Sequence, residues 1–261
     1  MTADAPTPPD GRDLLRDKVV LVTAAAGTGI GNATARRCLL EGATVVVSDA
    51  HERRLGETAD ELTDLAGGTR PLTFVCDVTV EEQVQAMVDG TVAGHGRLDV
   101  VVNNAGLGGT ADLVDMTDEQ WNKVLDITLT GTMRCMRATL RHMHEQGSGV
   151  IVNNASVLGW RAQAGQAHYA AAKAGVMALT RCAAIEAAPH GVRVNAVAPS
   201  LAMHAFLAKV TTDDLLDELT QREAFGRAAE PWEIATVIAF LASDYSTYMT
   251  GEIVSVSSQR A

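Results

Sequence analysis

The chain has 261 residues and a mass of 27.5 kDa, which is the size of one α/β domain. Hydrophobic residues make up 47% of it and charged residues 20%, as in a globular protein and not a disordered one. With 32 acidic and 21 basic side chains the net charge is −11, which argues against nucleic acid or an anionic membrane surface as partners. No apolar run approaches the ~20 residues that cross a bilayer.

The first sixteen residues contain Pro6, Pro8 and Pro9 but no apolar segment. We therefore expect residues 1–16 to form a flexible leader and not a secretory signal, and residues 17–261 to form a single domain. The four cysteines lie far apart in apolar segments, so we expect reduced, buried thiols of a cytoplasmic protein and no metal site. They are Cys38, Cys76, Cys135 and Cys182.

From Lys18 onward, short β-branched runs alternate with longer segments of helical pattern. The runs are apolar on both faces, as in strands of a parallel sheet that is covered by helices on both sides. The alternation predicts an α/β fold with a doubly wound parallel sheet. The expected strands are 19–22, 45–47, 72–75, 98–102, 150–152, 192–197 and 253–256, and the expected helices are 29–41, 52–66, 80–94, 118–146, 167–188 and 231–243.

After Pro199 the chain does not return directly to the last expected strand. It inserts residues from about 200 to 230, with a helix expected from Thr212 to Glu223. Loops beyond the carboxyl ends of parallel strands commonly carry binding functions. We therefore expect this insertion to form a substrate lid.

A glycine-rich loop follows the first expected strand. Thr23 ends that strand, and Gly27, Gly29 and Gly31 follow it, with a helix beginning near Ile30. Glycines let the backbone approach a pyrophosphate, whose charge the helix N-terminus then stabilises. The loop predicts dinucleotide binding, although glycines alone also suit an ordinary turn.

Asp49 closes the second expected strand, twenty residues after Gly29. A carboxylate there can accept hydrogen bonds from the adenosine ribose 2′-hydroxyl and repels a 2′-phosphate, which favours NAD over NADP. Arg53 and Arg54 follow closely and can reach a 2′-phosphate after a loop shift, so NADP stays open as the alternative.

Tyr169 and Lys173 lie four residues apart in a segment of helical pattern, so we expect them on one helix face. An ammonium beside a phenol favours the phenolate, so we predict that Lys173 lowers the pKa of Tyr169 from its usual ~10. Such a phenol can exchange a proton with an alcohol or ketone oxygen, and Ser156 is placed to hold the same oxygen. Each residue alone also suits an ordinary surface or strand-end position; together they predict a catalytic site.

With these residues the chain resembles the short-chain dehydrogenase/reductase (SDR) family, over nearly everything from Lys18 onward. The family's Ser, Tyr and Lys correspond to Ser156, Tyr169 and Lys173. The resemblance implies a Rossmann fold with strand order 3-2-1-4-5-6-7 and a bound NAD or NADP. It also implies a homotetramer, with a homodimer as the alternative, whose main interface involves segments 118–146 and 167–188.

The resemblance implies further cofactor contacts. The Asn-Asn-Ala-Gly segment at 103–106 lines the cofactor, an Asp-Val pair lies near the adenine, and the Asn-x-x-x-Pro segment at 195–199 lies beside the nicotinamide. The residues carried over in this way are Asp77, Val78, Asn104, Ala105, Gly106, Tyr169, Lys173, Pro199 and Ala202.

The sequence also departs from the family pattern. Ala24 stands where the first glycine of the loop usually falls, in a loop one residue longer than the common form. The fourth catalytic residue of the family is an Asn that anchors a proton relay to the lysine, and it corresponds to Thr128. We expect Thr128 to hold the relay water less well than Asn does. Near the carboxyl end, Ser257-Ser258-Gln259 replaces an Asp-Gly-Gly segment.

The expected reaction is hydride transfer between a secondary alcohol or ketone and a nicotinamide. Tyr169 would be the acid and base, Lys173 would lower its pKa and hold the nicotinamide ribose, and Ser156 would orient the carbonyl. A catalytically idle NAD-sensing or scaffold protein on the same fold stays open as the alternative.

The expected substrate wall is bulky and mostly apolar, which favours a hydrophobic, alicyclic substrate, although several of these residues also suit packing of the lid. Segments 154–161 and 223–232 resemble a bacterial branch of the family that acts on coenzyme A thioesters of indanones from degraded sterols. The 3-oxoacyl carrier-protein reductases are the wider neighbours and the default assignment, so an acyl substrate stays open as the alternative. Arg161 is a candidate contact for CoA phosphates, although an arginine there also suits an ordinary surface position. The candidate wall residues are Leu107, Val157, Leu158, Trp160, Gln163, Met203, Phe206 and Leu207.

Overall fold

The computed structural model describes residues 7–203 and 213–259. Seven parallel strands form one sheet in the order β3-β2-β1-β4-β5-β6-β7, so the expected order is confirmed. The strands are β1 (Val19–Val22), β2 (Thr44–Asp49), β3 (Leu72–Val75), β4 (Val100–Asn103), β5 (Gly149–Asn154), β6 (Val192–Pro199) and β7 (Ile253–Val256).

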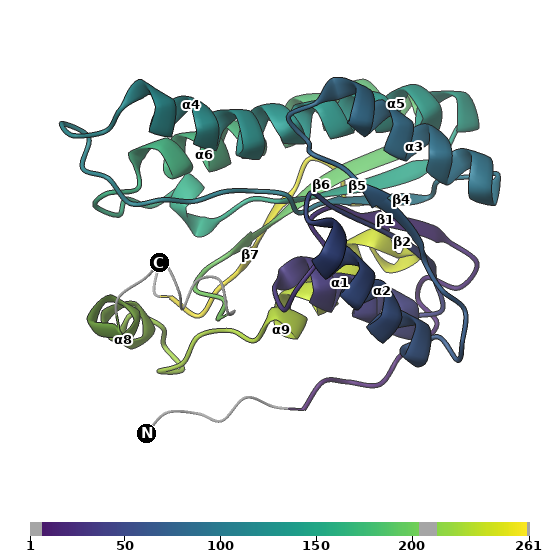
Figure 1. Ribbon diagram of the computed structural model, residues 1–261, viewed down its shortest axis with the longest axis horizontal. Helices are drawn as coiled ribbons and strands as arrows, with labels where there is room; N and C mark the ends of the chain where they lie inside the picture. The colour runs from purple at the N-terminus through teal and green to yellow at the C-terminus, as the bar shows by residue number, and fades with distance from the viewer. Residues whose placement is uncertain (1–6, 204–212, 260–261) are drawn as a thin grey trace.

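Helices cover both faces of this sheet, which confirms the doubly wound fold (Figure 1). One face carries α3 (Glu81–His95), α4 (Asp118–Leu125), α5 (Gly131–Gln146) and α6 (Ala167–Ala187). The other face carries α1 (Ile30–Leu40), α2 (Glu52–Leu65) and α9 (Pro231–Ala242). The remaining labelled helix, α8 (Asp213–Gln221), lies beyond the carboxyl ends of the strands.

The sheet separates the apolar cluster under α1 and α9 from two apolar clusters under the helices of the other face. The inner strands β1 and β4 are buried along their whole length, because helices cover both of their faces. The outer strands β3 and β7 are partly exposed. The carboxyl ends of the strands therefore rest on a packed scaffold, which holds the loops of the candidate site.

The chain before β1 packs against α1. Leu15 is fully buried, so the core begins within the segment that was expected to be a flexible leader. The buried carboxylate of Glu41 pairs with Arg37 and accepts hydrogen bonds from the backbone N–H groups of Arg12, at 2.7 Å, and Leu14, at 3.1 Å. Removing one partner of a buried ion pair typically costs about 3–5 kcal/mol, so this pair fixes the segment firmly.

Three of the four thiols are buried, as expected. Burial raises the pKa of Cys38 to about 12 and that of Cys76 to about 11, and it also raises the pKa of Cys135. Cys182 is exposed, so the expectation of four buried thiols is wrong there. The reason is that α6 is apolar on its outward face too, where Ile185 is 77% exposed.

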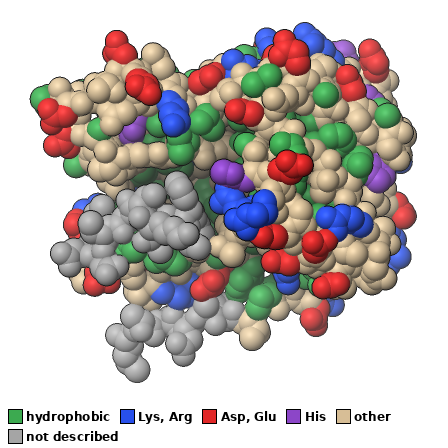
Figure 2. All heavy atoms as spheres, viewed as in Figure 1, with side chains coloured by type: hydrophobic (Ala, Val, Ile, Leu, Met, Phe, Trp, Pro, Cys, Tyr) green, Lys and Arg blue, Asp and Glu red, His purple; other side chains and the backbone are tan. Residues whose placement is uncertain are grey.

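Acidic side chains are spread over the face shown in Figure 2 and do not gather in one patch. None of the helices in the described part of the chain has the length and apolarity needed to cross a bilayer.

Candidate active site

The loop after β1 leaves the N-terminus of α1 open. Ala24 and Gly27 adopt left-handed backbone conformations, with φ of 49° and 90°. Gly29 is the N-cap of α1, where no side chain caps the helix and no acidic residue lies in the first turn. The buried Nδ2 of Asn32 has no hydrogen-bond partner among the described residues. An uncapped helix start with free N–H donors suits a pyrophosphate.

Thr23 and Asn104 join the ends of β1 and β4 beneath this loop. The Thr23 hydroxyl accepts from the backbone N–H groups of Asn104, at 3.0 Å, and Ala105, at 3.2 Å. The Asn104 Nδ2 donates to the carbonyl of Ala24 at 3.0 Å. At Gly31 an added Cβ would lie 2.2 Å from the Ala24 carbonyl oxygen, so the close approach of α1 requires glycine.

Asp49 faces the glycine loop from the end of β2. Its carboxylate accepts hydrogen bonds from the backbone N–H groups of Ala26, at 3.1 Å, and His51, at 2.9 Å. The nearby Arg53 forms an exposed ion pair with Glu57 at 2.5 Å, along α2. The carboxylate thus lies beside the phosphate-binding loop, and Arg53 is engaged elsewhere.

The other residues carried over from the family lie at neighbouring strand ends. Exposed Asp77 accepts hydrogen bonds from the backbone and hydroxyl of Thr79, at 2.9 and 2.8 Å. Buried Val78 packs so closely on α5 that an added Cβ at Gly131 would lie 2.6 Å from it. Pro199 ends β6 beside β7, and buried Ala202 forms a bridge with Ala229.

Ser156, Tyr169 and Lys173 come together at the carboxyl ends of β4 and β5. The buried Lys173 Nζ donates to the carbonyl of Asn154, at the end of β5, at 2.5 Å. The same Nζ lies 5.5 Å from the centroid of the Tyr169 ring. An added Cβ at Gly106 would lie 3.4 Å from this Nζ, so the 103–106 segment also borders the cluster.

Burial controls the ionisation of this cluster. Loss of water around the phenol raises the pKa of Tyr169 to about 12, and the Ser156 hydroxyl opposes this rise. Burial lowers the pKa of Lys173 to about 8. The structure therefore reverses the direction predicted for the pKa of Tyr169. The reason is that desolvation of the phenolate outweighs the ammonium, which contacts a carbonyl and not the phenol oxygen.

A π-helical turn over Asp126–Thr130 interrupts the segment expected as one helix over 118–146. Thr128 is fully buried in this turn. Its hydroxyl accepts from the backbone N–H of Leu107 at 2.9 Å and donates to the carbonyl of Leu107 at 3.1 Å. The single O–H donor of Thr128 is thus engaged with the Leu107 carbonyl and not available for the expected relay water. π-helical turns are frequent at functional sites.

The expected substrate wall is only partly described. Trp160 is 51% exposed, and Gln163 lines a cleft of ≈ 280 Å³ between the 162–164 segment and α8. The backbone N–H of Met203 donates to the carbonyl of Ala229 at 3.1 Å. Phe206 lies outside the described residues, as does the start of the expected lid helix.

The family described as "Enoyl-(Acyl carrier protein) reductase" matches residues 24–258. A (5R,7aS)-5-hydroxy-7a-methyl-1-oxo-2,3,5,6,7,7a-hexahydro-1H-indene-carboxyl-CoA reductase of Mycobacterium tuberculosis is 65% identical over 98% of this chain and 97% of its own. The chain belongs to the short-chain dehydrogenase/reductase family. It is an oxidoreductase of the SDR type, and the idle alternative is not supported.

Two further relatives support the same family assignment. A cis-4-hydroxycyclohexanecarboxylate dehydrogenase of Sinomonas cyclohexanicum is 44% identical over 92% of this chain and 95% of its own. The crystal structure of a short chain dehydrogenase from Mycobacterium smegmatis is 64% identical, covers 99% of both chains, and has a TM-score of 0.88. Members of the family use NAD or NADP.

Sequence reasoning missed a clamp beside the SDR cluster. The Gln166 side chain donates to the carbonyl of Gly109 at 2.8 Å and so ties the loop after β4 to the start of α6. His168 is 2% exposed behind this loop, where burial lowers its pKa. An added Cβ at Gly109 would lie 3.2 Å from the His168 Nε2. In the sequence, the adjacent glycines Gly108 and Gly109 were the feature that could have predicted this close contact.

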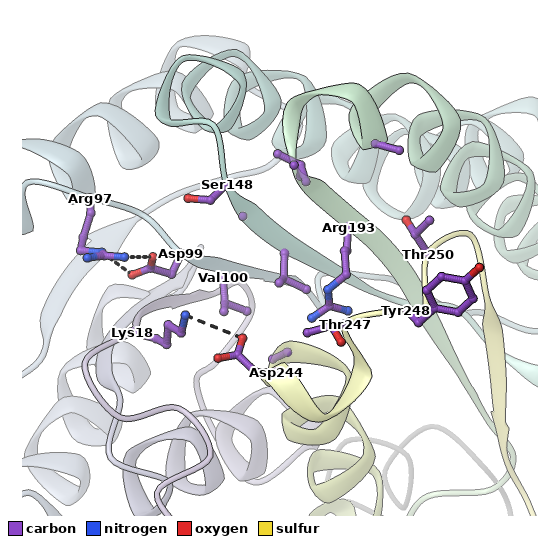
Figure 3. A pocket seen from close by; sticks show the side chains of 16 residues that line it. Lys18, Arg97, Asp99, Val100, Ser148, Arg193, Asp244, Thr247, Tyr248 and Thr250 are labelled. Atoms are coloured by element: carbon purple, nitrogen blue, oxygen red, sulfur yellow. Dashed lines mark hydrogen bonds and ion pairs between the residues drawn. The ribbon is translucent and has the colours of Figure 1, made fainter.

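A second cavity, of ≈ 620 Å³, lies at the opposite end of the strands from the candidate site, where β4, β5 and β6 begin (Figure 3). Arg97 faces Asp99 there at 2.6 Å, and Lys18 faces Asp244 at 3.9 Å. Arg193 donates to the carbonyl of Ser243 at 3.0 Å. These cations are engaged by the chain, so we assign no catalytic role to this cavity.

Proposed function

We propose that this SDR protein interconverts a ketone and a secondary alcohol on a CoA-linked cyclic substrate, with NAD as the preferred cofactor. The observation that carries the proposal is the convergence of Ser156, Tyr169 and Lys173, with Lys173 held by the Asn154 carbonyl at 2.5 Å. The open N-terminus of α1 supports it, because its free N–H groups suit the pyrophosphate of a dinucleotide.

When bound, the nicotinamide supplies the carbon that accepts or gives the hydride. Tyr169 gives a proton to the substrate oxygen during reduction and takes it back during oxidation, and Ser156 donates a hydrogen bond to the same oxygen. The Lys173 ammonium, 5.5 Å from the centroid of the Tyr169 ring, adds a positive charge that partly offsets the cost of the buried phenolate while the proton is away. Because burial raises the pKa of Tyr169 to about 12, the resting phenol is protonated, which suits reduction.

The preference for NAD rests on Asp49 beside the phosphate-binding loop and on the engagement of Arg53 with Glu57. Dissociation constants for NADH and NADPH test it. We expect tighter binding of NADH. Asp49→Ala should reduce the difference between the two dissociation constants, because it removes the charge that repels a 2′-phosphate. Asp89→Ala, on α3, is the control. If the wild-type protein binds NADPH tenfold more tightly, the preference is reversed.

The substrate class rests on the two relatives named above, one acting on a bicyclic carboxyl-CoA compound and one on a substituted cyclohexane. The exposed Trp160 and the backbone-anchored Met203 offer apolar surface to such a ring. Turnover should be measured with the bicyclic CoA substrate of the mycobacterial relative and with 4-oxocyclohexanecarboxylate. We expect at least a tenfold higher kcat/KM for the CoA compound; the opposite order would contradict the proposal.

We also propose a homotetramer, with a homodimer as the alternative, whose main interface uses α4, α5 and α6. The exposed Cys182 and Ile185, three residues apart on α6, support this because they leave apolar surface open on one face of that helix. Light scattering of the wild-type protein and of Ile185→Glu tests it. We expect the wild-type mass to be four times that of one chain and the variant to dissociate, whereas a monomeric wild-type protein would refute the proposal.

A further inference from the structure

Glu223 links three segments that are far apart in the sequence. It is 4% exposed and follows α8 directly. Its carboxylate accepts from the hydroxyl of Ser258 at 2.7 Å, from the Gln259 side chain at 2.9 Å and from the backbone N–H of Leu201 at 3.4 Å. The segment after β6, the segment after α8 and the segment after β7 therefore meet at one buried carboxylate.

Gln259 extends this link to the substrate side of the site. Its Oε1 accepts from the Arg161 guanidinium at 2.5 Å, while its Nε2 donates to Glu223 at 2.9 Å. The group that holds Arg161 is thus a neutral amide. Arg97 and Arg227, in contrast, each meet a carboxylate directly, at 2.6 and 2.7 Å. Among the described residues, no carboxylate pairs directly with the Arg161 guanidinium, which has further N–H donors to offer.

Arg161 lies in the loop that carries the candidate substrate residues. It follows Trp160, which is 51% exposed, and precedes the 162–164 segment that lines the ≈ 280 Å³ cleft. Across this cleft lie Leu219 of α8 and Arg222 just after it. Ser156, on the same loop, stands at the reacting end. Along the chain, Arg161 therefore stands between Ser156 and the segment that lines the cleft.

We propose that Arg161 is a specificity-determining residue that binds a phosphate group of a CoA thioester at the mouth of the site, and that Gln259 is its positioning residue. The inference rests on the proposed function and extends it to the nucleotide part of the CoA thioester. A guanidinium matches the geometry of phosphate oxygens, and its charge offsets the repulsion that a protein of net charge −11 exerts on CoA.

The first test measures binding without turnover. Free CoA is titrated calorimetrically into the protein saturated with NADH, so that the adenosine part of CoA cannot occupy the cofactor site. We expect Arg161→Gln to weaken CoA binding about tenfold, as expected for one hydrogen bond to a charged group, and Arg161→Lys to weaken it less. Arg70→Gln, a change of an exposed arginine before β3, is the control and should bind as the wild type does.

The second test separates recognition of phosphate from a structural effect. The kcat/KM for the bicyclic CoA substrate is compared with that for its pantetheine thioester, which carries no phosphate. Arg161→Gln should lower kcat/KM about tenfold for the CoA compound, through KM, and leave the pantetheine compound unchanged. Equal losses on both substrates would overturn the proposal.

Gln259 is tested by the same pair of substrates. In Gln259→Glu the acceptor for Arg161 becomes a carboxylate that neutralises the guanidinium directly, and the donor to Glu223 is lost. We expect a loss confined to the CoA compound, whereas a purely structural role predicts no difference between the two substrates. Ser258→Ala is the matched control, because it removes another hydrogen bond to Glu223 without touching Arg161.

The outcomes also separate this inference from the proposed function. If the protein reduces neither thioester but binds free CoA in a manner that depends on Arg161, the substrate ring is misassigned and the inference stands. If it reduces both thioesters equally well and Arg161→Gln has no effect on CoA binding, the proposed function stands and the inference fails.

Discussion

The Thr128 hydroxyl makes two hydrogen bonds to one backbone residue, accepting from the N–H of Leu107 at 2.9 Å and donating to its carbonyl at 3.1 Å. This pairing joins the π-helical turn before α5 to the loop after β4. The next residue of that loop, Gly108, borders the Tyr169 ring, since an added Cβ there would lie 3.8 Å from it. Thr128 therefore positions the part of this loop that borders the Tyr169 ring.

Replacing Thr128 by Val keeps the shape of the side chain and removes both hydrogen bonds. We expect Thr128→Val to lower the free energy of unfolding by about 1–3 kcal/mol, because the N–H and carbonyl of Leu107 lose their partners. Thr128→Ser keeps the hydroxyl and should lose less. Urea unfolding of both variants measures this, and equal stability of the two would show that the hydroxyl is not what holds the loop.

The stability of the protein should depend on pH through Tyr169 and Lys173. Lys173 has a pKa of about 8 in the folded protein against 10.5 in the unfolded chain, so the unfolded chain binds more protons between these values and stability rises with pH there. Tyr169 has a pKa of about 12 against 10.0, so its contribution falls as pH rises from 10 to 12. Each slope is at most about 1.4 kcal/mol per pH unit.

Unfolding curves between pH 7.5 and 11.5 test this, with each variant compared with the wild type. Lys173→Met should remove the rise above pH 8, and Tyr169→Phe should remove the fall above pH 10. If the difference between wild type and Lys173→Met does not change from pH 8 to pH 10, the ammonium is not desolvated as described.

The phosphate-binding loop contains one strained residue. Ala24 has a φ of 49°, a conformation that costs a non-glycine residue about 1–2 kcal/mol. Ala24→Gly should raise the free energy of unfolding by about 0.5 kcal/mol, after allowance for the greater freedom of glycine in the unfolded chain. Gly31→Ala should do the reverse and also weaken NADH binding, since its Cβ would lie 2.2 Å from the Ala24 carbonyl oxygen. A destabilised Ala24→Gly variant in thermal unfolding would contradict this account.

Much of the fold could be predicted because the strands are short apolar runs and the helices lie between them. The run 19–22 became β1 without change, and 72–75 became β3. The π-helical turn at Asp126–Thr130 could not be predicted, because it arises when Thr128 turns inward to Leu107 from another part of the chain. The burial of Leu15 likewise depends on the distant pair of Arg37 and Glu41.

The spacing of the candidate site residues could be predicted from the sequence, but their electrostatics could not. A spacing of four residues places Tyr169 and Lys173 on one helix face, and the structure has them there. The pKa of Tyr169 depends on how much water reaches the phenol, which spacing does not reveal. The link from Glu223 through Gln259 to Arg161 is also absent from any local pattern, since it joins residues up to 98 positions apart.

The central claim is that the Tyr169 phenol exchanges the proton while Lys173 and Ser156 hold the reacting groups. The most direct measurement is the turnover of Tyr169→Phe with the bicyclic CoA substrate, alongside its dissociation constant for NADH. We predict a loss of about 10²–10⁴-fold in kcat with NADH binding nearly unchanged, because only the hydroxyl is removed. A variant that keeps near-normal turnover would contradict the account.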